Sequence, residues 1–313
     1  MSAVPHITWP DGKKFAFTVF DDTDLTTVHN GPQLYGFLHD HGVITTKSVW
    51  PIKGDDEPVF GGSTCADEEY LAWVRQLAAQ GFEIGYHNAT FHSSKRTQAL
   101  AGLECFKELF GCYPNVFANH ARCIDSIHWG DNRVSGVNKL AYNLLTRYRH
   151  HGQFLGTDES SGYFWGDKCK EHVSYVRNFV YSDINTLKSC PAMPYRDEAR
   201  PFVNNWFASS EGANCRLFCS TIAEKNQDRL EEEGGACIMY THFGREDFHR
   251  DGKLDPEFVR LMQRLSKKNG WFVPVSTLLD HIIKQRGHHV ITSHERARLE
   301  RKWLLEKVFR GTT

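Results

Sequence analysis

Lys14–Asp24 reads Lys-Phe-Ala-Phe-Thr-Val-Phe-Asp-Asp-Thr-Asp, and the interpretation of the whole chain starts from this stretch. Phe15–Phe20 is an apolar run rich in aromatic residues, which predicts a buried strand. Three carboxylates, Asp21, Asp22 and Asp24, follow at its end. Crowded carboxylates repel one another and lose hydration on burial, so proteins keep them where a metal binds or where one acts as a base. The alternative is a structural role, in which these carboxylates form a solvated acidic turn or cap the N-terminus of a helix.

The composition describes a chain that can bury a full core. It has 313 residues, 40% hydrophobic and 13% aromatic, which suits one large α/β domain. The formal net charge of −1 argues against nucleic acid or a membrane surface as the main partner. We expect no signal peptide and no membrane span, because no basic segment precedes an apolar run and no apolar window is long enough. Nine scattered cysteines without a Cys-x-x-Cys pair indicate reduced thiols, and we therefore expect a cytoplasmic protein.

Strand-like and helix-like segments alternate along the chain. The predicted strands are Phe15–Phe20, Val43–Trp50, Phe82–Tyr86, Val116–Ala118, Val203–Ala208, Ala236–Tyr240 and Trp271–Val275. The predicted helices are Pro32–Asp40, Asp67–Gln80, Thr97–Phe110, Ser135–Tyr148, Ser220–Glu233, Asp255–Lys267 and Thr277–Lys284. Residues 152–201 are the least regular part and are expected to form loops around short strands.

This alternation predicts a parallel sheet or barrel with right-handed crossovers. The unusual polar residues all follow strands: Asp21 and Asp22, then His87, then Asn119 and His120, and finally His242. Active-site groups at the carboxyl ends of several strands are typical of a (β/α) barrel enzyme. A doubly wound sheet would carry a Gly-rich phosphate turn, and no strand is followed by one. The barrel is therefore favoured.

The character of the chain changes beyond about residue 287. Thr292 and Glu295 have the spacing of a capping box. A basic segment follows, with apolar residues near helical spacing at Leu299, Trp303, Leu304, Val308 and Phe309. We expect a barrel over residues 1–286 and a basic amphipathic helix over 287–313. Docking of this helix on the barrel is favoured, and a partner or homo-oligomer helix is the alternative.

Two histidines follow the third strand in Glu83-Ile-Gly-Tyr-His87-Asn-Ala-Thr-Phe-His92. Their spacing of five does not stack them on a helix, but both imidazoles can converge on one ion from a loop. With a carboxylate from Asp22 they form a His/His/Asp set that leaves positions open for water and substrate. Such a set is catalytic rather than structural and suits zinc or another divalent transition metal.

His242 follows the strand Ala236–Tyr240 in the same manner. One interpretation is a buried histidine bonded to a backbone carbonyl. The other is a general acid that protonates a leaving amine. The cysteines do not suggest a Cys/His nucleophile, because none lies beside a base at a strand end.

These motifs resemble the polysaccharide deacetylase family, carbohydrate esterase family 4. The resemblance spans roughly Phe15 to Ile283 and includes the closing phrase Gly270–Asp280. It implies a distorted, usually seven-stranded (β/α) barrel. By position, it implies Asp21 as the catalytic base, Asp22, His87 and His92 as metal ligands, and His242 as the acid. Asp24 is then expected to be a turn or N-cap residue.

The chain departs from the family pattern at several positions. The paired histidines are five residues apart instead of four, and Thr23 replaces the glycine after Asp-Asp. The Arg-x-Pro motif is absent, and Phe117-Ala-Asn-His-Ala-Arg122 stands in its place, so His120 is a candidate for contact with substrate or metal. Arg122 and Arg177 are candidates to orient Asp21. The predicted substrate-binding residues are Asn119, His120, Trp165, Asp167 and Arg177.

The expected function is metal-dependent hydrolysis of a non-peptide amide C–N bond. N-deacetylation of an amino sugar, as an oligosaccharide or a nucleotide-linked or lipid-linked precursor, is the favoured reaction. The expected cofactor is a divalent metal ion, with zinc first. A cyclic-amide hydrolase is the runner-up, and a non-catalytic carbohydrate-binding barrel that keeps the metal pocket is the alternative from another class.

Overall fold

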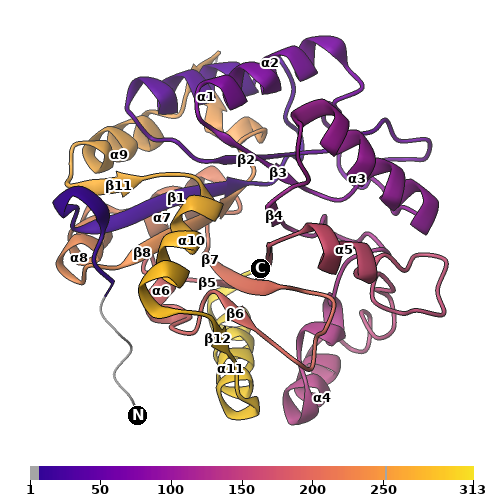
Figure 1. Cartoon of the computed structure of the whole chain (residues 1–313). Coiled ribbons are helices and arrows are strands. Elements are labelled where there is room, and N and C mark those ends of the chain that lie inside the picture. Colours follow the sequence, from indigo (N-terminus) through magenta and orange to yellow (C-terminus); the bar gives the residue numbers. More distant parts are fainter. Residues whose placement is uncertain (1–6, 251) are drawn as a thin grey trace.

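A closed barrel of seven parallel strands forms the centre of the molecule (Figure 1). The computed structural model describes residues 7–250 and 252–313. The barrel strands are β1 (Phe15–Asp21), β2 (Thr46–Val49), β3 (Glu83–Tyr86), β4 (Val116–Phe117), β5 (Tyr175–Tyr181), β7 (Asn205–Ser210) and β8 (Ala236–Thr241). Pairing of β8 with β1, from Ala236 beside Ala16 to Thr241 beside Asp21, closes the barrel. The predicted (β/α) barrel is confirmed.

Short strands extend the sheet outside the barrel. The segment β11 (Gly270–Phe272) pairs with the start of β1, and β6 (Tyr195–Arg196) runs antiparallel to β7. The segment β12 (His289–Val290) adds to β6. A separate hairpin consists of β9 (His249–Arg250) and β10 (Lys253–Leu254).

Helices surround the barrel, as Figure 1 shows. They are α1 (Gly31–Asp40), α2 (Glu68–Ala79), α3 (Arg96–Phe110), α4 (Gly136–Leu145), α5 (Gly166–His172), α6 (Thr186–Ser189), α7 (Cys215–Thr221), α8 (Glu224–Glu232), α9 (Pro256–Ser266), α10 (Val275–Arg286) and α11 (Ser293–Arg310). Local chemistry fixes several of their ends: the Asp67 side chain accepts hydrogen bonds from two N–H groups that begin α2, and α3 ends at Gly111 with φ +81°. None of the described helices is long and apolar enough to cross a bilayer.

Strand β1 is buried on both faces, and its alternate side chains serve two different cores. Phe15, Phe17 and Val19 pack in the layer between the sheet and helices such as α1 and α9. Ala16 and Phe20 belong to the other core, with residues of β3, β4 and β7. Successive side chains of a strand point to opposite faces, so the residues that follow Phe20 are also divided between two sides.

The segment 152–201 departs from the expectation of loops around short strands, because it contains the seven-residue barrel strand β5, which is entirely buried. The predicted helix Ser220–Glu233 is divided into α7 and α8. At the C-terminus the predicted capping box of Thr292 and Glu295 is present at the start of α11. This helix packs on the barrel: Trp303 lies with its ring 5.2 Å from Phe179 of β5.

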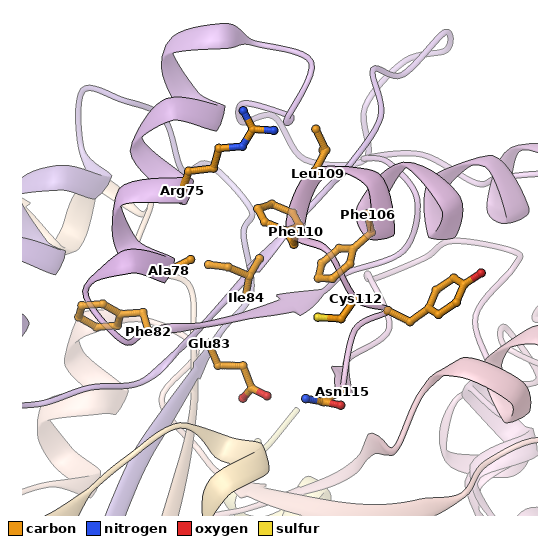
Figure 2. A pocket seen from close by; sticks show the side chains of 11 residues that line it. Arg75, Ala78, Phe82, Glu83, Ile84, Phe106, Leu109, Phe110, Cys112 and Asn115 are labelled. Carbon is orange, nitrogen blue, oxygen red and sulfur yellow. The ribbon is translucent and has the colours of Figure 1, made fainter.

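A pocket of about 370 Å³ lies between α2, α3 and the start of β3 (Figure 2). Arg75, Phe82, Phe106 and Phe110 are among the residues that line it. Glu83, the first residue of β3, also borders it, whereas His87 follows the last residue of β3. The pocket therefore lies near the amino end of this strand, away from the end where barrel enzymes carry their active sites.

Candidate metal and acid–base site

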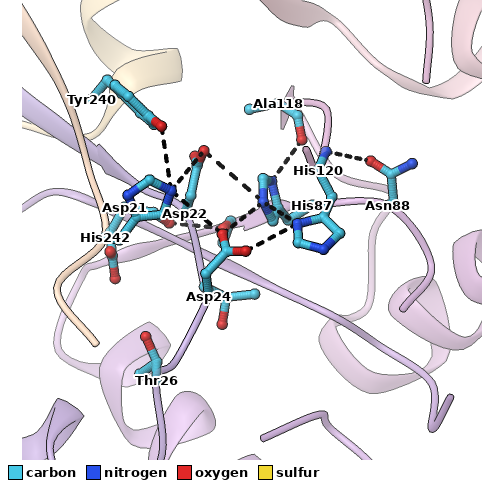
Figure 3. Close-up of polar contacts among 12 residues, drawn as sticks. Asp21, Asp22, Asp24, Thr26, His87, Asn88, Ala118, His120, Tyr240 and His242 are labelled. Atoms are coloured by element: carbon cyan, nitrogen blue, oxygen red, sulfur yellow. Dashed lines mark hydrogen bonds and ion pairs between the residues drawn. The ribbon is translucent and has the colours of Figure 1, made fainter. Parts of the chain in front are cut away.

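Polar side chains from four strand ends converge at the carboxyl end of the barrel (Figure 3). Asp22 and Asp24 follow β1, His87 follows β3, His120 follows β4, and His242 follows β8. The carboxyl ends of parallel strands meet at one rim, so residues distant in sequence become neighbours there. All of them are buried except His242, whose side chain is 19% exposed.

Asp24 is the centre of this cluster. Its Oδ2 lies 3.2 Å from His87 Nε2 and 3.6 Å from His242 Nε2, and its Oδ1 lies 3.1 Å from His120 Nδ1. Burial would raise the pKa of Asp24, but hydrogen bonds and charge from His120 and His87 outweigh it and hold that pKa well below its usual range. Ligand atoms of Asp24, His87 and His120 all lie within 4.8 Å of one another.

The two histidines beside Asp24 are held differently. His87 Nδ1 donates a hydrogen bond of 2.8 Å to the Ala118 carbonyl, which can only accept, so Nδ1 carries a proton and Nε2 faces the cluster. His120 Nδ1 lies 3.2 Å from His87 Nε2, while its own Nε2 is buried without a hydrogen-bond partner among the described residues. Two imidazoles and a carboxylate are donors that a zinc-type ion accepts, so the residues fit a divalent metal.

Asp22 points into the same cluster and is held by Arg177 of β5. Two hydrogen bonds, of 2.8 Å and 2.6 Å, join the guanidinium to both carboxylate oxygens. Burial would lower the pKa of Arg177, but Asp22 outweighs this effect and raises it. Asp22 Oδ2 lies 3.9 Å from both His87 Nε2 and His242 Nε2. Arg177 is therefore the arginine that orients an aspartate here, and that aspartate is Asp22, not Asp21.

Asp21 lies on the other side of β1, toward the helices. Its Oδ2 accepts a hydrogen bond of 2.8 Å from Tyr35 and lies 3.2 Å from Lys47 Nζ, and its Oδ1 accepts one from the Phe243 N–H. Burial raises the pKa of Asp21 and lowers that of Lys47, although each ion offsets this effect in the other. Both carboxylate oxygens are thus occupied outside the cluster.

His92 is not part of the cluster either. Its Nε2 accepts a hydrogen bond of 3.0 Å from the Asp55 N–H, and its Nδ1 lies 3.0 Å from the Ser93 carbonyl oxygen. Nε2 therefore has a partner in the loop that follows β2, and Nδ1 has one in the loop that carries His92 itself. The structure brings His120 beside Asp24 and His87, in the place where His92 was expected.

The remaining predicted residues lie around the site and have structural partners. Asn119 exchanges two hydrogen bonds with the Ile127 backbone, and the buried Trp165 donates one of 2.6 Å to the Asp125 carbonyl. Asp167 forms a two-point ion pair with Arg96 near the surface. The catalytic and binding roles of all these residues remain predictions.

Asp24, Lys47 and Tyr35 were not predicted as part of this architecture. Asp24 lies in the turn that follows β1, as expected, and the Thr26 N–H donates a hydrogen bond of 3.0 Å to the Thr23 carbonyl across this turn. Its place in the cluster could not be predicted from strand alternation, because β1 ends at Asp21 and the turn directs the Asp24 side chain.

Comparison with solved structures supports this fold. Neither a protein-family model nor a curated protein sequence matches the chain. A protein from Mycobacterium smegmatis described as a polysaccharide deacetylase superposes with a TM-score of 0.52 at 14% identity, covering 92% of this chain and 96% of its own. The fold is that of the polysaccharide deacetylases.

Two further structures resemble this polysaccharide deacetylase fold with TM-scores of 0.49 and 13% identity. One is a protein from Pseudomonas aeruginosa with the same description, covering 91% of this chain and 96% of its own. The other is an allantoinase, covering 92% of this chain and 96% of its own.

Proposed function

We propose that the protein is a metal-dependent hydrolase of a non-peptide amide C–N bond, and that its substrate is an N-acetylated amino sugar. Such a sugar would be presented as an oligosaccharide or as a nucleotide-linked or lipid-linked precursor. The observation that carries the proposal is the buried cluster of Asp24, His87 and His120, beside an arginine-paired Asp22 and the partly exposed His242.

Asp24, His87 and His120 are the residues that would hold the metal. Their donor atoms come from one carboxylate and two imidazoles, and such a three-residue set leaves coordination positions for water and substrate. A divalent ion, with zinc first, would supply Lewis-acid polarisation of the amide carbonyl and a lowered pKa of water. The Ala118 carbonyl fixes the His87 tautomer, and Asn88 fixes the His120 backbone through a 2.8 Å hydrogen bond.

Asp22 is the proposed general base. A base must accept the proton of the attacking water as a carboxylate, and Arg177 supplies the counter-ion that a buried carboxylate needs. Arg177 engages both oxygens, so the carboxylate cannot rotate away from the cluster. Its Oδ2 faces His87 and His242, at 3.9 Å from each, and this position supports the proposed role.

His242 is the proposed general acid. Its Nδ1 lies 3.0 Å from the Ala213 carbonyl oxygen, which can only accept, so Nδ1 carries a proton and Nε2 faces the cluster. A protonated Nε2 can pass its proton to the departing nitrogen, which leaves as an amine. His242 is also the most exposed member of the cluster, on the side from which a substrate would approach.

The substrate would approach through the loops that carry Asp24 and His242. Leu25, Asn30 and Gly244–Asp247 line a pocket of about 650 Å³ at the ends of these loops. Gly244 lets the two loops meet, because a Cβ there would lie 2.3 Å from the Thr26 nitrogen. A pocket of this size suits a sugar ring adjacent to the reacting amide.

Acetate release tests the proposal. The metal-loaded protein would be incubated with N-acetylated monosaccharides, their oligomers and nucleotide conjugates, and a cyclic ureide. We expect acetate from at least one amino sugar, and Asp22→Asn should reduce kcat about 100-fold or more while the bound metal remains. Loss of metal from Asp22→Asn would assign Asp22 a ligand role.

Two other results would contradict the proposal. Stoichiometric metal without acetate release from any substrate would favour the non-catalytic carbohydrate-binding barrel. Hydrolysis of the cyclic ureide alone would keep the amide chemistry but overturn the amino-sugar substrate. Val290→Ala, at an exposed position on β12, serves as the matched variant that should not alter the rate.

A further inference from the structure

Large apolar side chains are exposed on one part of the surface. Among the described residues, the exposed large apolar side chains are Leu25, Phe60, Val290 and a group of eight on α4, the turn after it, and α11. The eight are Val137, Leu140, Leu144, Leu145, Tyr148, Leu305, Val308 and Phe309, each at least half exposed, with Val137 at 83% and Phe309 at 78%. We call them the α4–α11 face. Exposed apolar patches of this kind mark interaction sites.

The two helices that carry this face are in contact and lie at the same end of the molecule (Figure 1). Asn138 of α4 donates a hydrogen bond to the Ala297 carbonyl of α11, and the rings of Tyr142 and Trp303 stack 5.7 Å apart. Val137, Leu140 and Leu144 follow the three-to-four spacing of a single face of α4, and that face points outward; Tyr148 is exposed in the turn after the helix.

The same region is strongly basic, although the whole chain has a net charge of −1. Residues 135–152 contain three Lys or Arg and no Asp or Glu, and residues 293–313 contain six Lys or Arg and three Glu. Arg147, Arg149, Arg298, Arg301 and Arg310 are exposed. The three glutamates have partners: Glu295 forms the capping box, Glu300 is buried, and Glu306 accepts a 2.6 Å hydrogen bond from the Ser182 N–H.

The positive charge of the α4–α11 face indicates which kind of partner it binds. A symmetric contact with a second copy would bring basic residues against basic residues, which repel one another. A peptide helix needs a groove with two walls, but the shallow hollow on α11 is lined only by residues of α11 itself, from Arg298 to Arg310. Helices that present Leu, Val and Phe among Lys and Arg suit the interface of an anionic lipid layer.

We propose that the α4–α11 face docks the protein on an anionic lipid surface. Leu144, Leu305 and Phe309 enter the boundary between headgroups and acyl chains, and Arg147, Arg298 and Arg301 contact the lipid phosphates. Binding combines burial of apolar area with attraction between opposite charges, so it depends on anionic lipid and weakens with salt. The mean hydropathy and the net charge of the chain do not reveal this face, because both combine the contributions of all residues.

Co-sedimentation of the full-length protein with vesicles tests the proposal. One set of vesicles contains phosphatidylcholine alone, and the other contains phosphatidylcholine with phosphatidylserine. We expect binding to the anionic vesicles at least about tenfold tighter than to the neutral ones, and lost in 0.5 M salt. The double variant Leu144→Ser/Phe309→Ser and the double variant Arg298→Gln/Arg301→Gln should each weaken it about tenfold.

Val290→Ser is the matched control, because Val290 is 49% exposed on β12, outside the α4–α11 face. It should bind like the wild type, and thermal unfolding would verify that all variants remain folded. Equal binding of the wild type and Leu144→Ser/Phe309→Ser would overturn the proposal. A second result would also overturn it: the wild type does not bind anionic vesicles and instead forms a dimer in light scattering, and this double variant is monomeric. The face would then bind a second copy of the chain.

Discussion

Asp21, Asp22 and Asp24 lie within four residues of one another, yet each has a different partner. Lys47 and Tyr35 hold Asp21 on the helix side of β1, Arg177 holds Asp22 inside the barrel rim, and two histidines surround Asp24. Each buried carboxylate therefore has its own counter-charge, as burial of charge requires. This separation leaves Asp22 and Asp24 available for the proposed chemistry, while Asp21 is bound on the other side of β1.

The ion pair of Lys47 and Asp21 provides a prediction about stability. Lys47→Met removes the cation and leaves the Asp21 carboxylate buried without its counter-ion, so we expect the free energy of unfolding to fall by about 3–5 kcal/mol. Urea denaturation measures this loss. The double variant Lys47→Met/Asp21→Asn should recover much of it, since no charge then remains buried. Equal losses in the single and double variants would contradict the assignment.

At the scale of elements, α11 packs on the barrel through several buried side chains, of which Trp303 is the largest. The Trp303 ring lies 5.2 Å from Phe179 of β5 and 5.7 Å from Tyr142 of α4, and the Arg133 guanidinium lies 4.4 Å from it. This contact joins a barrel strand and two helices. The helix therefore belongs to the folded core through one face and leaves the other face available.

Trp303→Ala tests this arrangement. Removing a fully buried indole leaves a cavity, and we expect the free energy of unfolding to fall by about 3–5 kcal/mol in chemical denaturation. Leu305→Ala in the same helix is the control and should change it by no more than about 0.5 kcal/mol, because Leu305 is exposed. Similar losses in both variants would indicate that the helix does not dock through Trp303.

Most of the helices and strands, and part of the candidate site, could be predicted from the sequence. Alternating strands and helices identified the barrel, and polar residues after strands identified His87, His120 and His242. Strand β5 was missed because Tyr175–Tyr181 contains Arg177 and Asn178, which disguise a buried strand, and their partners are distant in sequence. His92 and His120 could not be ranked from spacing, since the choice depends on the course of two loops. Asp24 could not be placed by strand alternation either, because it lies in a turn beyond the end of β1.

At the scale of the whole molecule, burial of single titratable groups links stability to pH. His128 stacks near Phe202, and burial, with the charge of Arg200, lowers its pKa to about 3. As the pH falls, His128 in the unfolded chain takes up a proton near pH 6.5, whereas in the folded chain it does so only near pH 3. The stability that this histidine contributes is therefore present above pH 6.5 and is lost as the pH falls toward 3.

We predict that His128→Asn flattens the acid side of the stability profile. The wild type should lose about 1.4 kcal/mol per pH unit from this group between pH 6.5 and 3, and the variant should lack this component. Asn tolerates the positive φ of 44° at this position. Urea denaturation at pH 5 and pH 7.5 measures the slope. An unchanged slope in the variant would show that His128 does not titrate on unfolding.

The barrel as a whole brings residues from four strand ends to one rim, and the central claim is that Asp24, His87 and His120 hold a metal there. The most direct test is the metal content of the dialysed protein, measured by mass spectrometry for the wild type, His120→Ala and His92→Ala. We predict about one divalent ion per chain in the wild type and in His92→Ala, and none in His120→Ala. Metal retained by His120→Ala and lost from His92→Ala would contradict it.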